Sequence, residues 1–453
     1  MKKKVLLIML VVLLSSIGAL QRNVNVEAEV TTETWDKAYA VSQDKVWNVA
    51  FNTKMSPSSF TSDTVYVMNN STKSKHPVTF SLSSDGKVLS VKPTKPYTMH
   101  QEYTLHVDQK VASSLNRTMI KSIELPFLIS NKYVITDFNG KALKSYNDLD
   151  TAIANAATDN TQMIQLDGTT VWIQSGIART KAYTLIYDSP TLQKNITYVS
   201  GESELQYVKS YGEILQIKVA GKTGYVEADK VNLIPYKLAT GKRSYYKNVD
   251  GDLYHYIYTS SGFGVYKYGA APANMANGAI AYSWDGKTFN GQTAFFLNQR
   301  DLRTPSSVTA AELDNYIKAN KADSPMIGLG KTFIEMEKQY NVNAVYLMAH
   351  AIHESAWGMS KIAREKNNLY GINATDSNPY GNADTYKSYE GSVMYAAKYI
   401  SDKYLTSGTW QYNGRFLGNK AEGMNVRYAS DPFWGQKIAG HMYRAEQWIK
   451  ANR

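Results

Sequence analysis

Glu354 is the residue whose type and position most directly suggest chemistry. It stands in the segment HAIHESAWG, near the end of a stretch whose apolar residues recur at helical spacing. At about 100° per residue, Glu354 falls almost opposite the apolar face, beside Leu347 and His350, and is predicted to face a cleft or solvent. The apolar face, which should be buried, comprises Val345, Met348, Ala349, Ile352 and Ala356.

The predicted position of Glu354 favours its protonated form. It lies in the last helical turn, where the negative end of the helix dipole disfavours a carboxylate, and the neighbouring Trp357 would shield it from water. Both effects raise the pKa of a carboxyl group. A carboxylic acid that stays protonated near neutral pH suits the cleavage of glycosidic bonds, because the leaving oxygen must receive a proton. The alternative for such a residue is a solvated surface carboxylate.

Two histidines on the same helix raise the question of a metal site. His350, His353 and Glu354 read His-x-x-His-Glu. This order differs from the His-Glu-x-x-His pattern of zinc hydrolases and from its inverted form, and no third ligand stands out in the sequence. We therefore expect neither a metal nor another cofactor, and we interpret both histidines as packing or hydrogen-bonding residues.

Two longer segments in the C-terminal third are more specific than any single residue. They are HAIHESAWGMSKIAREKNNLYGINATDSNPYG and NVRYASDPFWGQKIAGHM. In order, they contain Glu-Ser-x-x-Gly, Asn-Leu-Tyr-Gly-Ile and Tyr-Ala-Ser-Asp-Pro. They resemble glycoside hydrolase family 73, the β-N-acetylglucosaminidase family of bacterial autolysins, which has a lysozyme-like fold. The resemblance covers residues 300–453 and extends back toward residue 241 through YSWDGKTF.

This resemblance implies roles for individual residues. The family's catalytic acid corresponds to Glu354, and its tyrosine near the cleft corresponds to Tyr428. Its loop asparagine and loop aromatic residue correspond to Asn368 and Tyr370. Together with Trp357, which follows the catalytic acid closely, these side chains are expected to line the substrate cleft.

The identity of a second catalytic group stays open. Many glycosidases use two carboxylates, and in some members of family 73 a second Glu lies on a hairpin after the Asn-Leu-Phe/Tyr-Gly segment. Here that region reads NATDSNPYGNADTYKSYEG, in which Asp376 and Asp384 are candidates. Glu390 is a third, although it falls in the first turn of a predicted helix, where an acidic residue is expected. Alternatively the substrate's own N-acetyl group assists, with Tyr428 orienting it.

Helix-start signals around these motifs predict a mainly helical C-terminal region. Thr309 and Glu312 form a capping-box pair, and Asn343 can cap the helix that carries Glu354. Asp431 and the proline after it look like the N-cap and first turn of the last helix. The predicted helices run from Thr309 to Ala319, Ser324 to Tyr340, Asn343 to Trp357, Ser388 to Tyr404 and Pro432 to Lys450.

The chain before residue 300 is predicted to be rich in strands. Short β-prone runs with turn signals between them predict a β-sandwich over residues 29–131, and AFNTKMSP with LSVKPTKPY resembles bacterial Ig-like modules. Residues 132–182 should form a small α/β element with a helix over 147–157. The ending KTGYVEADKVNLIPY of residues 183–240 resembles an SH3-like module, which would bind the cell wall or act as a spacer.

The predicted fold class is therefore multidomain. N-terminal β-sandwich and SH3-like β modules precede a mainly α, lysozyme-like (α+β) catalytic domain over residues 301–453. Between them, residues 241–300 form an aromatic-rich β segment. Its tyrosines would serve the packing of strands or, in part, stack on sugars.

Residues 1–28 are predicted to be a signal peptide. Residues 2–4 are all Lys, Val5 to Leu14 form an apolar run too short to span a bilayer comfortably, and Val26-Glu27-Ala28 offers a cleavage site. An uncleaved anchor is the alternative. We expect a secreted, wall-associated protein with no stable membrane span after processing. The absence of cysteine fits an exported bacterial protein whose cores need no disulfides.

Charge and resemblance together predict the partners. Peptidoglycan glycan strands follow from the resemblance. A formal net charge of +11 would also attract anionic wall polymers. Nucleic acid is not expected, because the chain after residue 28 has no Lys/Arg run of the length that binds it.

The resemblance implies hydrolysis of the β-1,4 bond between N-acetylglucosamine and N-acetylmuramic acid by general acid catalysis. A lytic transglycosylase, which uses a similar helical domain and a single Glu, is one alternative. A wall-binding protein without activity is another, although the intact Glu-Ser-x-x-Gly segment at Glu354 argues against it.

Overall fold

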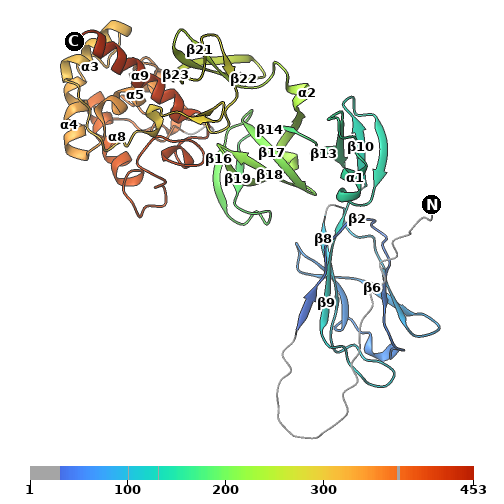
Figure 1. Ribbon diagram of the computed structural model, residues 1–453. Helices are drawn as coiled ribbons and strands as arrows, with labels where there is room; N and C mark the ends of the chain where they lie inside the picture. Colours follow the sequence, from blue (N-terminus) through green and yellow to red (C-terminus); the bar gives the residue numbers. More distant parts are fainter. Residues whose placement is uncertain (1–30, 100, 131, 375–377) are drawn as a thin grey trace. The chain divides into compact units, whose positions relative to one another are not determined.

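The computed structural model describes residues 31–99, 101–130, 132–374 and 378–453, and divides into two compact units that meet in the chain between Trp172 and Ile173 (Figure 1). Residues 1–28, the predicted signal peptide, lie outside the described residues. Within the described ranges, no helix is both long enough and apolar enough to cross a membrane.

The first unit begins with two β-sheets that share one core. Along their strands, buried and partly exposed residues alternate, as expected when one face of each sheet is covered. Trp47 and Phe127 meet in this core with ring centroids 4.8 Å apart. One sheet contains β1 (Thr32–Thr34), β9 (Ser122–Ile129), β8 (Glu102–Val107), β4 (Val65–Asn69) and β5 (Lys75–His76), with β2 (Ala38–Val41) also on β9. The other contains β3 (Trp47–Ala50), β7 (Val88–Pro93) and β6 (Val78–Leu82).

A smaller sheet with one helix follows. Helix α1 (Leu149–Asn155) is capped by Asp148, whose carboxylate accepts a hydrogen bond from the Thr151 amide at 2.7 Å, and this confirms the predicted helix. The strand order is β11 (Ala142–Tyr146), β10 (Tyr133–Asp137), β12 (Gln162–Leu166) and β13 (Thr169–Ile173).

The second unit opens with an antiparallel sheet over residues 176–235. Its first strand, β14 (Gly176–Thr180), pairs with β17 and β20 and so joins this sheet rather than the α/β element before it. Whether the sheet is SH3-like stays a prediction. The strand order is β16 (Asn195–Val199), β15 (Thr184–Tyr187), β19 (Lys222–Glu227), β18 (Ile214–Val219), β17 (Glu204–Tyr211), β14 and β20 (Val231–Pro235).

The aromatic-rich segment packs on the helices that follow it. Helix α2 (Tyr236–Ala239) leads into a sheet ordered β23 (Gly262–Ala270), β22 (Asp252–Thr259), β21 (Tyr245–Val249) and β24 (Ile280–Ala281). A β25–β26 hairpin (Thr288–Phe289 and Gln292–Thr293) comes next. Tyr246 and Tyr268 are buried in the same core as the helices, so packing is the main role of these inward-facing rings.

The C-terminal region is helical, as predicted. The capping box of Thr309 and Glu312 is present, and Asn343 accepts a hydrogen bond from the Tyr346 amide. Ser388 is the N-cap of the helix that ends just before Tyr404. The helices are α3 (Ala310–Asn320), α4 (Gly330–Tyr340), α5 (Ala344–Ser355), α6 (Lys361–Lys366), α7 (Pro379–Asn382), α8 (Tyr389–Lys403) and α9 (Trp434–Ala451). The short α6 and α7 were not predicted.

Two helix starts differ from the prediction. Helix α4 begins at Gly330 rather than near Ser324, because the Asp314 carboxylate binds the amides of Gly328 and Gly330 in the preceding turns. Helix α9 begins at Trp434 rather than at residue 432. Asp431 accepts from the Phe433 amide in the turn before the helix.

Helix α5 is buried on all sides, not on one face. Leu347 and His350, which lie opposite the predicted apolar face, are fully buried. Ala356 was predicted to belong to the core, but it is exposed and forms the left-handed C-cap at φ 50°. The helix therefore runs through the middle of the domain and reaches the surface only at its C-terminal end, where Glu354 lies.

Helix α9 packs directly against strand β23, and Gly440 permits the contact. A Cβ atom at Gly440 would lie 1.9 Å from the Lys267 carbonyl oxygen. The approach of two backbones at this distance requires glycine.

We expect Gly440→Ala to lower the free energy of unfolding by about 1–3 kcal/mol, because the helix must move away from the strand. Helix propensity alone would favour alanine by about 1 kcal/mol. Gly264→Ala is the matched control, since nothing lies within 4 Å of a Cβ atom at that position on β23. Denaturant unfolding of both variants tests the contact, and equal stability of Gly440→Ala and the wild type would contradict it.

Candidate active site

A cleft of about 540 Å³ opens at the C-terminal end of α5. Glu354 is the only carboxylate among the described residues that line it. Most of the remaining lining is tyrosine, which offers an apolar ring and a hydroxyl group to a ligand. The lining residues are Tyr183, Tyr198, Glu354, Tyr370, Gly371, Ile372, Asn373, Ala374, Tyr399, Tyr404, Tyr428, Ala429 and Ser430.

The Glu354 carboxylate is held from two sides. The Trp434 indole Nε1 donates a hydrogen bond to Oε1 at 2.7 Å, and His350 Nε2 lies 3.6 Å from the same oxygen. On a third side the loop backbone comes close, since a Cβ atom at Gly371 would lie 3.9 Å from Oε2. The side chain is 27% exposed, which leaves one approach open to a ligand.

His350 links Glu354 to buried tyrosines. Its Nδ1 lies 3.1 Å from the Tyr346 hydroxyl and its Nε2 lies 3.2 Å from the Tyr428 hydroxyl. The edges of the Tyr370 and Trp434 rings surround the imidazole at centroid distances of 5.0 and 5.2 Å. His350 is thus a buried hydrogen-bonding residue beneath the cleft.

The pKa of Glu354 is lowered, which corrects the prediction that it is raised. Burial raises the pKa of this carboxyl group, as predicted. The hydrogen bond and positive charge of His350, the charge of His353 and the Trp434 hydrogen bond act in the opposite direction and outweigh burial. The position of Glu354 in the last helical turn does not decide the direction, because His350 lies one turn earlier and the Trp434 indole comes from α9.

Two predicted substrate-binding residues lie in the cleft beside Glu354. Tyr370 donates its hydroxyl to the Leu347 carbonyl at 3.1 Å, so its ring forms part of a fixed wall. Tyr428 stacks on Trp434 with ring centroids 4.4 Å apart. The structure thus brings Glu354, Tyr370 and Tyr428 together.

Asn368 and Trp357 do not line the cleft. Asn368 is buried, and its side chain binds the backbone of its own loop, at Ile372 and Asp384 among others. It therefore shapes the loop that carries Tyr370. Trp357 follows the helix end and packs near Tyr316, with ring centroids 5.9 Å apart, outside the cleft lining.

The two candidate second carboxylates that the structure describes, Asp384 and Glu390, lie outside the cleft lining. Asp376 lies outside the described residues. Asp384 does not line the cleft, and both of its oxygens accept from Asn373 Nδ2 at 3.1 Å. It therefore positions Asn373, which does line the cleft. Glu390 lies in the first turn of α8 beside Ser388, whose hydrogen bond lowers the pKa of its carboxyl group.

Tyr183 and Tyr198 complete the cleft from the β14–β20 sheet, and sequence reasoning missed them. Tyr198 donates its hydroxyl to the Arg427 carbonyl at 2.8 Å, and β16 makes a second bond from Thr197 to the Val426 carbonyl at 2.9 Å. These contacts join residues more than two hundred positions apart. No local pattern signals such a pairing.

Lys420 supports the same wall of the cleft from behind. It is buried, and its ammonium donates to the carbonyls of Asn425 and Ala429 at 2.6 and 2.7 Å. It also lies 4.4 Å from the centre of the Tyr198 ring. Burial lowers the pKa of Lys420 to about 7. The Lys420 amine therefore holds both ends of the loop from Asn425 to Ala429, which carries Tyr428.

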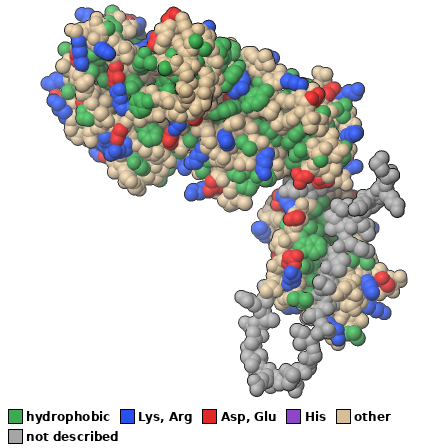
Figure 2. All heavy atoms as spheres, in the orientation of Figure 1, with side chains coloured by type: hydrophobic (Ala, Val, Ile, Leu, Met, Phe, Trp, Pro, Cys, Tyr) green, Lys and Arg blue, Asp and Glu red, His purple; other side chains and the backbone are tan. Residues whose placement is uncertain are grey.

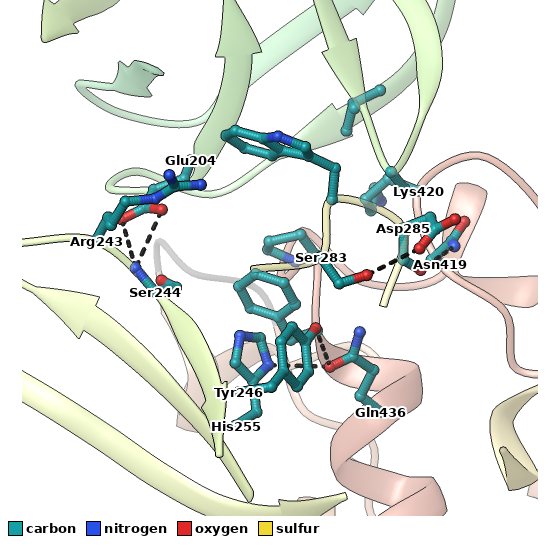
Figure 3. A pocket seen from close by; sticks show the side chains of 15 residues that line it. Glu204, Arg243, Ser244, Tyr246, His255, Ser283, Asp285, Asn419, Lys420 and Gln436 are labelled. Atoms are coloured by element: carbon teal, nitrogen blue, oxygen red, sulfur yellow. Dashed lines mark hydrogen bonds between the residues drawn. The ribbon is translucent and has the colours of Figure 1, made fainter. Parts of the chain in front are cut away.

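A second cavity, of about 40 Å³, is lined in part by Lys420 and has room only for a few water molecules at roughly 10–15 Å³ each (Figure 3). Its polar groups bind one another: the Ser244 amide donates to Glu204, and Tyr246 donates to Gln436 at 3.1 Å. This cavity lies where the β14–β20 sheet meets the helical region, and it is too small to hold a sugar.

The described residues contain no group of three or more His, Cys, Asp or Glu side chains arranged to hold a metal ion. His350 Nε2 lies 3.6 Å from the Glu354 carboxylate, whereas His353 lines a different pocket from Glu354. Both imidazoles lower the pKa of the Glu354 carboxyl group.

Two protein families match parts of the chain. Residues 330–447 match the family described as mannosyl-glycoprotein endo-β-N-acetylglucosaminidase, and residues 26–127 match the bacterial Ig-like domain. A putative endo-β-N-acetylglucosaminidase of Streptococcus pneumoniae is 35% identical over 276 residues, covering 58% of this chain and 39% of the relative. A β-N-acetylglucosaminidase of Bacillus subtilis is 25% identical over 183 residues, covering 38% and 21%.

The chain spans less than half the length of these curated relatives. Among solved structures, S. aureus Autolysin E matches with 24% identity and a TM-score of 0.29, over 34% of this chain and 72% of that chain. The matched residues 330–447 include α5 and most of α9, and they contain Glu354, Tyr370 and Tyr428. Residues 330–447 belong to the glucosaminidase family of glycoside hydrolases, and the chain carries this domain after a bacterial Ig-like domain.

Proposed function

We propose that the protein is an exported peptidoglycan hydrolase that cleaves the β-1,4 bond between N-acetylglucosamine and N-acetylmuramic acid. The observation that carries the proposal is the position of Glu354 in a tyrosine-lined cleft where no other described lining residue is a carboxylate. The relatives named as β-N-acetylglucosaminidases support the choice of bond and substrate.

Glu354 would act as the general acid. A sugar strand in the cleft places a glycosidic oxygen near the open side of the carboxyl group, and proton transfer to that oxygen lets the leaving sugar depart. In the free protein His350 and Trp434 favour the ionised form. A bound strand would displace water from the cleft and add desolvation, which raises the pKa toward the protonated form that the reaction needs.

The second catalytic role would fall to the substrate. Because Asp384 pairs with Asn373 and lies outside the cleft lining, we assign the attack on the anomeric carbon to the N-acetyl oxygen of the same sugar. The Tyr428 hydroxyl, 3.2 Å from His350 Nε2, would orient that group. Water then opens the cyclic intermediate and leaves a reducing N-acetylglucosamine end. Participation by Asp376 is the alternative, and Asp376→Asn separates the two.

The remaining modules would place the enzyme in the wall. Tyr183 and Tyr198 extend the cleft onto the β14–β20 sheet, so this sheet, which we assign as SH3-like, would contact the glycan strand itself. The Ig-like domain would act as a spacer or wall-binding module. Secretion through the segment at residues 1–28 would give the protein access to its substrate.

We expect digests of purified peptidoglycan by the wild type to contain saccharides that end in reducible N-acetylglucosamine, as measured by mass spectrometry. Glu354→Gln keeps the size of the side chain but cannot donate the proton, so these products should fall by at least about 10²-fold. Glu365→Gln, on nearby α6, is the matched control and should leave them unchanged.

Other products would overturn the proposal in distinct ways. Anhydro-muramyl ends would show a lytic transglycosylase. A wild type that sediments with cell walls and releases no saccharide would show a binding protein without activity. Full activity of Glu354→Gln would remove Glu354 from the mechanism.

We expect Trp434→Phe to shift the alkaline limb of the kcat/KM profile to higher pH by about one unit, because it removes one hydrogen bond to the carboxylate. The sign follows from the lowered pKa. The acid must be protonated, so kcat/KM falls as pH rises above the Glu354 pKa, and losing a donor raises that pKa. The assay uses glycan strands freed of stem peptides, whose own ionisation would interfere.

Trp410→Phe is the control for this measurement, since Trp410 is exposed and lies outside the cleft lining. Its profile should match the wild type. An unshifted limb in Trp434→Phe, or a shift toward acid pH, would contradict the role of the indole.

A further inference from the structure

The chain is basic, yet on the face drawn in Figure 2 its cations are dispersed. Its formal net charge is +11, and on the face drawn in Figure 2 the Lys and Arg side chains are spread among Asp and Glu rather than gathered in one patch. Selective binding of an anion would therefore need a local pocket in which cations converge and carboxylates are absent.

One pocket in the second unit meets this condition. Its volume is about 420 Å³, and it lies between the C-terminal part of α5, one face of α9 and the β22–β23 hairpin. No Asp or Glu is among its described lining residues, which are Ile257, Thr259, Gly264, Val265, Tyr266, His353, Lys437, His441 and Arg444.

The cationic side of the pocket is a regular stripe on α9. Lys437, His441 and Arg444 are spaced i, i+4 and i+7, so they share one helix face. The Arg444 guanidinium donates to His441 Nδ1 at 2.7 Å, which leaves the hydrogen of a neutral imidazole on Nε2. Arg444 forms no ion pair with a carboxylate among the described residues.

His353 completes the cluster from α5. Its ring centroid lies 5.8 Å from that of His441, and its nitrogens make no hydrogen bond with another described residue. Lys437 pairs with the Asp431 carboxylate at 2.6 Å, which neutralises that ammonium in part, and lies 5.8 Å from the centre of the Tyr266 ring. The uncompensated charge in the pocket is therefore that of Arg444, with further donors from both histidines.

We propose that this pocket binds a phosphate or phosphodiester group through Arg444, Lys437, His353 and His441. A guanidinium is the side chain best suited to a phosphate oxygen pair, and imidazole and ammonium donors can serve the remaining oxygens. Donors that approach from two helices suit a tetrahedral oxyanion better than a planar carboxylate. Exposed Val265 marks an open edge through which the phosphate of a polymer can enter.

Binding should strengthen as pH falls. Burial lowers the pKa of His353, with Lys437 and His350 adding to the effect while Glu354 and Asp431 oppose it. Burial also holds the pKa of His441 well below its usual value, as do Arg444 and His353. Tyr266 faces the pocket from β23 and stays protonated. A bound anion favours imidazolium, so binding takes up protons and tightens as pH decreases.

Calorimetric titration of the full chain at low ionic strength tests the proposal with inorganic phosphate and with dimethyl phosphate. Saturable binding of either probe supports the pocket. Comparable binding of both assigns it to phosphodiester polymers, and binding of inorganic phosphate alone assigns it to the free ion. No saturable binding of either probe would overturn the proposal.

Arg444→Gln should weaken binding by about tenfold or more, because it removes a charge-assisted contact. Arg415→Gln is the matched control: Arg415 is an exposed arginine of the same unit that pairs with Asp301 outside the pocket. It should leave affinity within about twofold, since screened surface charge contributes little. Equal weakening by both variants would show nonspecific charge attraction and would overturn the proposal.

Proton NMR of the wild type gives a second readout that does not depend on a stable variant. Addition of sulfate, which stays dianionic between pH 5 and 8 unlike phosphate, should shift the ring signals of His353 and His441 and raise both pKa values. His441→Gln assigns one of the signals. Unmoved signals, or sulfate affinity that does not rise toward acid pH, would contradict the site.

Discussion

The structure depends on one carboxyl group held at the end of a buried helix. Glu354 is fixed by the Trp434 indole at 2.7 Å and by His350 one turn earlier, which lies 3.6 Å away. Burying an ionised carboxylate is costly unless donors and positive charge compensate. Much of the surrounding architecture supplies that compensation: α9 delivers the indole, and the tyrosines at 346 and 428 fix the imidazole.

The same constraint explains why the cleft has walls from distant parts of the chain. The loop around Tyr428 needs support behind it, and buried Lys420 provides it by binding the carbonyls at 425 and 429. The β14–β20 sheet also holds this loop, because the Tyr198 hydroxyl donates to the Arg427 carbonyl. Tyr198 lines the cleft as well. The sheet and the helices thus act as one body around Glu354, and a module that was predicted to be a wall-binding unit or spacer forms part of the site itself.

Local signals predicted the elements well. Capping at Thr309 and Asn343 fixed helix starts because a side-chain oxygen and a nearby amide decide them. Helix α4 was placed too early because Asp314, from another helix, satisfies the turn before it. Short α6 and α7 were missed, since helices of four to six residues have little periodicity to detect.

Only the part of the site that the sequence motifs contain was predicted. Glu354, Tyr370 and Tyr428 meet in the cleft, but Asn368 instead holds its loop and Trp357 packs elsewhere. The direction of the Glu354 pKa shift could not be predicted, because it depends on whether His350 and Trp434 face the carboxylate. Those orientations follow from tertiary packing, as does the contribution of Tyr183.

The central claim is that His350 and Trp434 keep Glu354 ionised in the free protein and that a bound glycan reverses this. Carbon-13 NMR of the glutamate carboxyl groups, with Glu354→Gln used for assignment, measures the pKa directly with and without peptide-free glycan strands. In the free wild type we predict that the pKa of Glu354 lies below that of an exposed glutamate. With the strand bound, we predict that the pKa of Glu354 in the wild type is higher. A free-protein pKa above that of an exposed glutamate would contradict the account, since burial alone would then govern the carboxyl group.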